Sequence, residues 1–236
     1  MRDVGRGEMR AASWLCLLSA AACLISGAAF AASVAVNQVI TVQPIDVCAK
    51  RGPFTVCAPF NTTSISKGND VLDTSATPSG APSTGQVLAE VAKVTGNRPV
   101  PGAYYPVYSD QPRGSAGYCA WHSSGTINGV QVEFGFFFNL DGDPGCDPQS
   151  PSSLGHSQGL AALANVSGHE LSEMLTDPQL NAWYDRQGAE NSDKCAWTWS
   201  GTVAIGGQSW KIQGNWSNAA AAARTGYANV GCIQTR

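Results

Sequence analysis

The clearest alternation of apolar and polar positions lies in the middle of the chain, over residues 130–140. Every second residue there is apolar and falls on one side of an extended backbone, namely Val130, Val132, Phe134, Phe136 and Phe138. Because successive side chains of a strand point to opposite faces, this stretch is predicted to be a strand with one face packed against a core. The Asp-Gly-Asp-Pro-Gly run at residues 141–145 ends it.

Helical spacing replaces this alternation after residue 156. Apolar residues recur three and four positions apart as far as Thr176, namely Leu160, Leu163, Val166, Leu171, Met174 and Leu175. The pattern predicts one long amphipathic helix, which Pro178 and the polar residues before it end. The same spacing of valine and leucine over residues 86–94 predicts a shorter helix.

Weaker patterns surround these two helices. Strands are predicted over residues 34–47, 104–108 and 118–122. A segment rich in Ser, Thr, Pro and Gly over residues 61–85 is predicted to lie on the surface. After residue 197 the pattern predicts short strands and turns, with a helical insert at residues 219–223. Together the elements predict an α+β domain with a mixed or antiparallel sheet, one long helix and a C-terminal β region.

The first 31 residues have the composition of a cleavable secretion signal. Three arginines precede an apolar run over residues 11–30, and a small-x-small sequence predicts cleavage after Ala31. A transmembrane anchor is the competing interpretation, but the run is rich in Ala, Ser and Gly and no basic cluster follows it. The chain is therefore predicted to divide into a signal peptide (1–31), a strand and flexible segment (32–85) and a main domain (86–236). After export it is expected in the periplasm or outside the cell, with no stable membrane anchor.

Charge and cysteine content narrow the classes of function. Removing the signal takes three of the 14 basic and two of the 17 acidic residues, which changes the net charge from -3 to about -4. Such a chain lacks the positive field that binding phosphates requires, which argues against a nucleic-acid partner.

The six remaining cysteines of an exported chain predict up to three disulfides. Local pairs are preferred among the possible connectivities: Cys48–Cys57, Cys119–Cys146 and Cys195–Cys232.

The predicted long helix contains an HExxE sequence at residues 169–173. Residues four apart lie on one helix face, about 6 Å apart at their roots, so His169 and Glu173 can bind the same metal ion. Glu170 lies one step around the helix, where it can take a proton from a metal-bound water. The competing interpretation is an ordinary solvated helix face.

A catalytic zinc site takes a third protein ligand and keeps one position open for water. Glu190 lies 21 residues beyond His169, and Asp193 follows it by three. One carboxylate of this pair can bind the metal, while the other accepts the spare ring N–H of His169 and orients the ring.

These motifs resemble a family of exported bacterial proteins with the ordered pattern HExxE, TDP, WYD and ExxDxC. The matching residues are His169, Glu170, Glu173, Thr176, Asp177, Pro178, Trp183, Tyr184, Asp185, Glu190, Asp193 and Cys195. More distantly, the chain is similar to the plant phosphate-induced (EXORDIUM-like) extracellular proteins, and the Cys-aromatic-His element at residues 119–122 matches both groups. The resemblance covers residues 118–195.

The resemblance implies a zincin-like domain and the machinery of a zinc-dependent peptidase. In this interpretation zinc is bound by His169, Glu173 and Glu190, with Glu170 as general base and Asp193 as the partner that orients His169. The strand over residues 130–140 would be the edge strand beside the substrate, although the core side of any sheet is the simpler interpretation. Glu173 replaces the usual second histidine, and its added negative charge would lower the Lewis acidity of the ion.

Several side chains keep two interpretations. The Tyr184 hydroxyl can stabilise an oxyanion, or the ring can pack under a loop. His122, which is a stronger candidate than His156, is either a ligand or a hydrogen-bonded structural residue.

Two functions stay open. One is a secreted zinc peptidase acting on a peptide or protein. The other is a non-catalytic extracellular binding or signalling protein on the same scaffold, contacting cell-wall carbohydrate through its tryptophans.

Overall fold

The structure is a computed structural model that describes residues 45–51, 54–60, 70–75, 80–148, 155–228 and 230–234. Outside these residues lie the predicted signal peptide, most of the predicted strand at 34–47 and about half of the surface segment at 61–85. The first described elements, β1 (Ile45–Arg51) and β2 (Phe54–Phe60), form an antiparallel hairpin. Cys48 is the register partner of Cys57, but their side chains lie outside the described part of the chain, so this disulfide stays a prediction.

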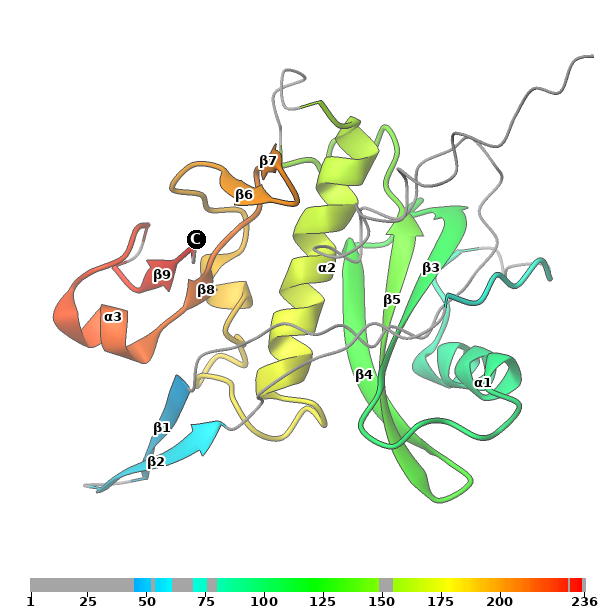
Figure 1. Cartoon of the computed structure of the whole chain (residues 1–236), viewed down its shortest axis with the longest axis horizontal. Helices are drawn as coiled ribbons and strands as arrows, with labels where there is room; N and C mark the ends of the chain where they lie inside the picture. Colours follow the sequence, from blue (N-terminus) through cyan, green and yellow to red (C-terminus); the bar gives the residue numbers. More distant parts are fainter. Residues whose placement is uncertain are drawn as a thin grey trace, which may run out of the picture.

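The main unit is built from three strands and two helices, and both predicted helices are confirmed (Figure 1). Its elements are α1 (Thr84–Val94), β3 (Tyr104–Pro112), β4 (Ala120–Ile127), β5 (Val130–Asn139) and α2 (Gln158–Thr176). Helix α1 begins two residues before its predicted start because Ser83 caps it. The Ser83 hydroxyl accepts from the Gln86 backbone N–H, and the Gln86 side chain accepts from the Ser83 N–H.

The sheet has the order β3-β5-β4 and is mixed, because β5 runs parallel to β3 and antiparallel to β4. The predicted α+β class with a mixed sheet and one long helix is confirmed. The suggestion that residues 130–140 form an edge strand is wrong, because β5 is the central strand with a neighbour on each side.

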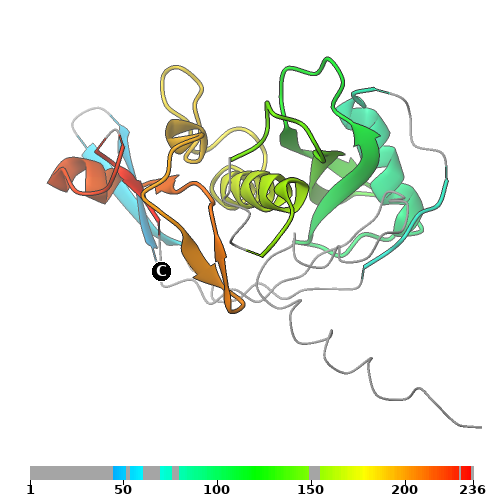
Figure 2. The same ribbon diagram turned by 90° about the horizontal axis from the view of Figure 1, so that it is seen from above.

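The helices cover opposite faces of this sheet (Figure 2). The α1 face holds the alternating apolar residues of β5, including Val132 and Phe134, which are fully buried and belong to one core cluster with Val91. On the α2 face Tyr108 stacks on Phe137, with ring centroids 4.7 Å apart, and its hydroxyl is 3.1 Å from Ser167 Oγ on α2. The α2 face therefore combines apolar packing with polar contacts.

The C-terminal region contains only short elements, as its weak periodicity predicts. They are η3 (Asp193–Cys195), β6 (Val203–Ile205), β7 (Gln208–Trp210), β8 (Asn215–Trp216), α3 (Asn218–Ala223) and β9 (Cys232–Ile233). The predicted disulfides Cys119–Cys146 and Cys195–Cys232 are both present. None of the helices among the described residues is long and apolar enough to cross a membrane.

Candidate metal centre

Three buried side chains from β4 and α2 meet between the sheet and the helix. His122 is the register partner of Gly135 on β5, on the face that α2 covers. Its Nδ1 lies 3.2 Å from Glu170 Oε2 and 3.7 Å from Glu173 Oε2. His122, Glu170 and Glu173 are 8%, 6% and 3% exposed, so all three side chains are buried.

The spacing of these three donors fits a small divalent cation. Their ligand atoms all lie within 4.8 Å of one another. A tetrahedral zinc ion with bonds of about 2.0 to 2.1 Å separates its ligand atoms by about 3.3 Å. The separations of 3.2 and 3.7 Å around His122 Nδ1 therefore need only small side-chain shifts to surround one ion.

Glu190 approaches the other ring nitrogen of the same histidine. Its Oε1 is 3.8 Å from His122 Nε2, and both atoms are buried without a hydrogen-bond partner in the described part of the chain. Burial, followed by the negative charge of Glu173, raises the pKa of Glu190 to about 7. A metal on Nδ1 would leave an N–H on Nε2 that points at Glu190, the carboxylate–histidine–metal arrangement that fixes a ligand ring.

A second group of side chains uses the other oxygen of Glu173. Glu173 Oε1 is 3.0 Å from His169 Nε2 and accepts a 3.0 Å hydrogen bond from the Asp193 backbone N–H. Asp193 Oδ1 lies 3.4 Å from the same His169 nitrogen. The two carboxylate oxygens of Glu173 therefore face two different histidines, one buried and one 16% exposed in its side chain.

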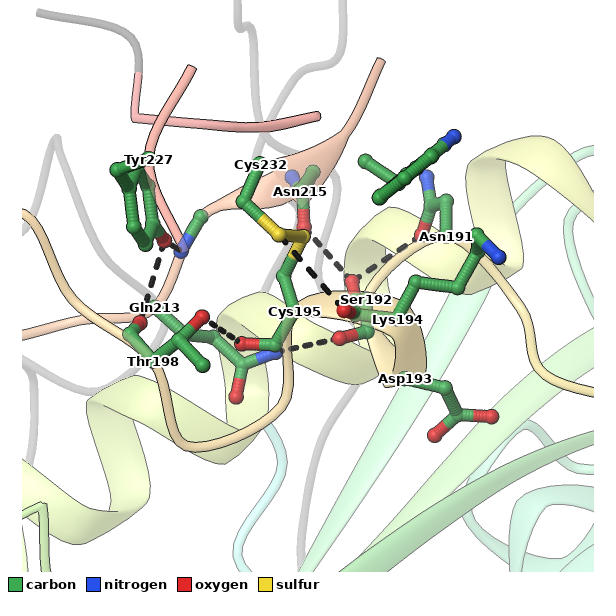
Figure 3. Close-up of a disulfide and its surroundings, with 12 residues drawn as sticks. Asn191, Ser192, Asp193, Lys194, Cys195, Thr198, Gln213, Asn215, Tyr227 and Cys232 are labelled. Atoms are coloured by element: carbon green, nitrogen blue, oxygen red, sulfur yellow. Dashed lines mark hydrogen bonds between the residues drawn. A yellow bond between two sulfur atoms is a disulfide. The ribbon is translucent and has the colours of Figure 1, made fainter. Parts of the chain in front are cut away.

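The hydrogen bonds of the Gln213 side chain determine which ring nitrogen of His169 carries a hydrogen. Its side-chain amide donates to the Ser192 backbone carbonyl at 2.9 Å, and its Oε1 accepts from the Trp197 backbone N–H at 3.4 Å. Backbone groups have fixed donor and acceptor roles, so both ends of this amide are determined. The remaining amide hydrogen points at His169 Nδ1, 3.0 Å away, which must accept it. Figure 3 shows Gln213 beside Ser192, next to the Cys195–Cys232 disulfide.

The hydrogen of His169 consequently lies on Nε2, facing the carboxylates. Burial lowers the pKa of His169, but hydrogen bonds to Asp193 and Glu173 outweigh it and raise the pKa well above its ordinary value. Gln213 opposes this rise, because a proton on Nδ1 would face an amide donor. In the neutral and the charged ring alike Nε2 carries a hydrogen, so His169 donates to Glu173 in this arrangement and cannot also bind a metal there.

The centre carries more negative than positive charge. It holds four carboxylates, from Glu170, Glu173, Glu190 and Asp193, and their ion-pair partners among the described residues are histidines. Burial lowers the pKa of His122, yet the hydrogen bond and charge of Glu170 and the nearby glutamates raise it overall. With all four carboxylates ionised, negative charge remains even when both rings are protonated, and buried charge is costly unless it is neutralised. A divalent cation would neutralise it.

The structure divides the residues that the sequence singled out. His169, Glu173 and Asp193 meet in one group, Glu170 joins His122, and Glu190 contacts the far side of the His122 ring. Tyr184 lies in the loop after α2 and is 54% exposed, unlike the buried groups of the centre. Gln213 was not predicted as a site residue, because it belongs to no motif in the sequence. His122 was predicted only as a secondary candidate, and the Cys-aromatic-His element was the feature that indicated it.

Comparison with known proteins adds no relative. No family model, no curated protein and no solved structure matches the chain. The resemblance to the exported bacterial and EXORDIUM-like families therefore stays a prediction.

Proposed function

We propose that this protein is an exported metalloprotein that binds one divalent transition-metal ion through His122 Nδ1, Glu170 and Glu173. The observation that carries the proposal is a group of three buried donors within 4.8 Å of one another, in a centre with excess negative charge. Export is supported by the disulfides, which persist in oxidising compartments.

Zinc is the first choice for this ion. One imidazole nitrogen with carboxylate oxygens is a mixed donor set that zinc accepts, and zinc has no geometric preference from its d electrons. Manganese, which favours carboxylates, is the nearest competitor. Three protein ligands leave a coordination position for water, which is the arrangement of catalytic zinc sites.

Purified protein is expected to contain about one zinc per chain by elemental mass spectrometry. Removing it with a chelator should lower the unfolding temperature, since at a free concentration 100 times the Kd the ion stabilises the native state by about 2.7 kcal/mol. The difference should be larger at pH 8 than at pH 5. The pKa of Glu190 is 4.5 when unfolded and about 7 when folded, so its contribution to metal-free stability is present below 4.5 and lost as pH rises through 7.

No metal in the untreated protein, together with the same unfolding temperature with and without the chelator at both pH values, would overturn the metal proposal. Reloading the chelated sample with zinc, manganese or calcium in parallel identifies the preferred ion. His156 provides a control residue, because its ring stacks on Trp210 with centroids 4.3 Å apart and it belongs to neither donor group. His156→Gln should therefore keep the metal.

Hydrolysis of peptides is a second candidate function, favoured by a carboxylate at the open side of the centre. The Asp193 side chain is 46% exposed and lies in the group that shares Glu173 with the buried donors. Its hydrogen bond to His169 lowers the pKa of Asp193, which keeps the carboxylate ionised as a proton acceptor but makes it a weaker base. The alternative is a binding protein with the same ion and no turnover.

Glu170→Gln separates these roles in an assay of zinc-loaded protein on unfolded polypeptides, with products read by mass spectrometry. If Glu170 is a ligand, as proposed, the variant loses both zinc and hydrolysis. If Glu170 is the general base that the HExxE sequence predicts, zinc stays and hydrolysis alone is lost. Asp193→Asn is expected to keep zinc and to lower hydrolysis by about 100-fold or more. No cleavage by zinc-loaded wild-type protein would support the non-catalytic function.

A further inference from the structure

A buried tyrosine hydroxyl beside the metal centre has no partner. Tyr104 on β3 is 8% exposed, and its hydroxyl is buried without a hydrogen bond to any described residue. The other tyrosines of the same strand are satisfied. Tyr105 accepts a 2.7 Å hydrogen bond from the Val100 N–H, and Tyr108 pairs with Ser167. Since buried hydroxyls nearly always have partners, the Tyr104 hydroxyl points to a partner that the described residues do not supply.

Strand register places this hydroxyl on the same face as His122. Tyr104 is the register partner of Glu133 on β5, two residues before Gly135, so Tyr104 and Gly135 point to the same face. Gly135 is in turn the partner of His122 on β4. The phenol thus extends along the α2 face of the sheet toward the strand that supplies the histidine.

Gly135 leaves the space that the phenol occupies. A Cβ built on Gly135 would lie only 2.2 Å from the Tyr104 hydroxyl oxygen, far inside van der Waals contact. Any side chain at this position would push the phenol away from the centre. The glycine in the middle of a central strand therefore has a specific steric reason, the close approach of another group.

We propose that the Tyr104 hydroxyl donates a hydrogen bond to an oxygen ligand on the metal ion, which is water in the resting protein and a carboxylate or hydroxamate oxygen when such a ligand is bound. This inference rests on the proposed metal centre and adds the class of ligand that it selects. The hydroxyl keeps its proton at neutral pH, because the ordinary pKa of a tyrosine is about 10 and burial raises the pKa of Tyr104 further. A protonated phenol can donate to an anionic oxygen, as oxyanion-stabilising groups do.

Tyr104→Phe removes this donor and little else, and acetohydroxamate is the oxygen ligand to use as a probe. Calorimetric titration of the zinc-loaded protein should show binding weakened about tenfold in the variant, the size of one hydrogen bond to a charged group. Zinc content should stay at one per chain. Tyr108→Phe is the matched control, because it removes a buried hydroxyl from the same strand that bonds to Ser167 instead, and its affinity for the probe should equal wild type.

The cobalt-substituted protein gives a second readout that a structural role would not change. Ionisation of the metal-bound water alters the visible spectrum, and loss of a donor to the resulting hydroxide should move the midpoint of that pH titration up by about 1 unit in Tyr104→Phe. Gly135→Ala, which displaces the phenol, should move it in the same direction.

The two proposals fail in distinguishable ways. Wild-type protein that binds neither zinc nor cobalt overturns the metal centre, and the role of Tyr104 with it. Wild-type protein that binds one ion, with a Tyr104→Phe variant whose acetohydroxamate affinity and cobalt titration both equal wild type, overturns the role of Tyr104 alone.

Discussion

Replacing His122 with glutamine is expected to lower the affinity of the protein for the metal ion by more than about 100-fold. Loss of a residue that only hydrogen-bonds to a metal ligand costs less, about 10- to 100-fold. His122 is the only nitrogen donor in the buried group, and its ring lies between Glu170, Glu173 and Glu190. Without it the remaining donors are carboxylates whose mutual repulsion has no imidazole to moderate it. Competition titration with a chromogenic chelator measures the affinity directly.

His169→Gln is the informative companion to this variant. Because the His169 Nε2–H already donates to Glu173, its loss removes an orienting contact and is expected to cost about 10- to 100-fold in affinity while saturation still reaches one ion per chain. The sequence-based ligand set predicts the reverse, with loss of the ion in His169→Gln and retention in His122→Gln. That reversed result would contradict the ligand assignment made from the structure.

Removing the C-terminal disulfide is expected to lower stability by about 4 kcal/mol without removing the ion. Cys195 and Cys232 are 37 residues apart in sequence and 5.7 Å apart at their Cα atoms. Closing a loop of that length restricts the unfolded chain by about this amount. The bond joins η3 to β9, whereas the metal ligands come from β4 and α2.

Urea denaturation of a Cys195→Ala/Cys232→Ala variant tests this expectation, with zinc content measured on the same preparation. Alanine is preferred to serine because Cys195 and Cys232 are fully buried and a hydroxyl there would lack a partner. A loss of stability below about 1 kcal/mol would contradict the loop-closure argument. Complete loss of zinc from the folded variant would show that the centre depends on the C-terminal region more than its ligands suggest.

Local patterns in the sequence were sufficient for β5 and both helices of the main unit, whereas β3 and β4 run four and five residues past their predicted ends. The apolar alternation of β5 and the helical spacing of α2 are properties of neighbouring residues, so each predicted its element directly. The preference for local disulfides was correct for both pairs that the structure describes. Strand order was not accessible in this way. The position of β5 between β3 and β4 depends on pairing between segments that share no periodic signal.

The candidate site was only partly visible for the same reason. Helix geometry brings His169 near Glu173, and this contact is local. The contact of His122 with Glu170 spans 48 residues and depends on the register of β4 against β5 and on the packing of α2 over both. Gln213 lies in a region of short strands and loops, where one glutamine looks like any other polar surface residue until its amide is seen between Ser192 and His169.

The most direct test of the ligand assignment is a crystal structure of the zinc-loaded protein with an anomalous difference map at the zinc edge. We expect one peak per chain, about 2.0 to 2.2 Å from His122 Nδ1 and from oxygens of Glu170 and Glu173, with Glu190 within hydrogen-bond distance of His122 Nε2. A peak bonded to His169 Nε2, or no peak near either histidine, would contradict it.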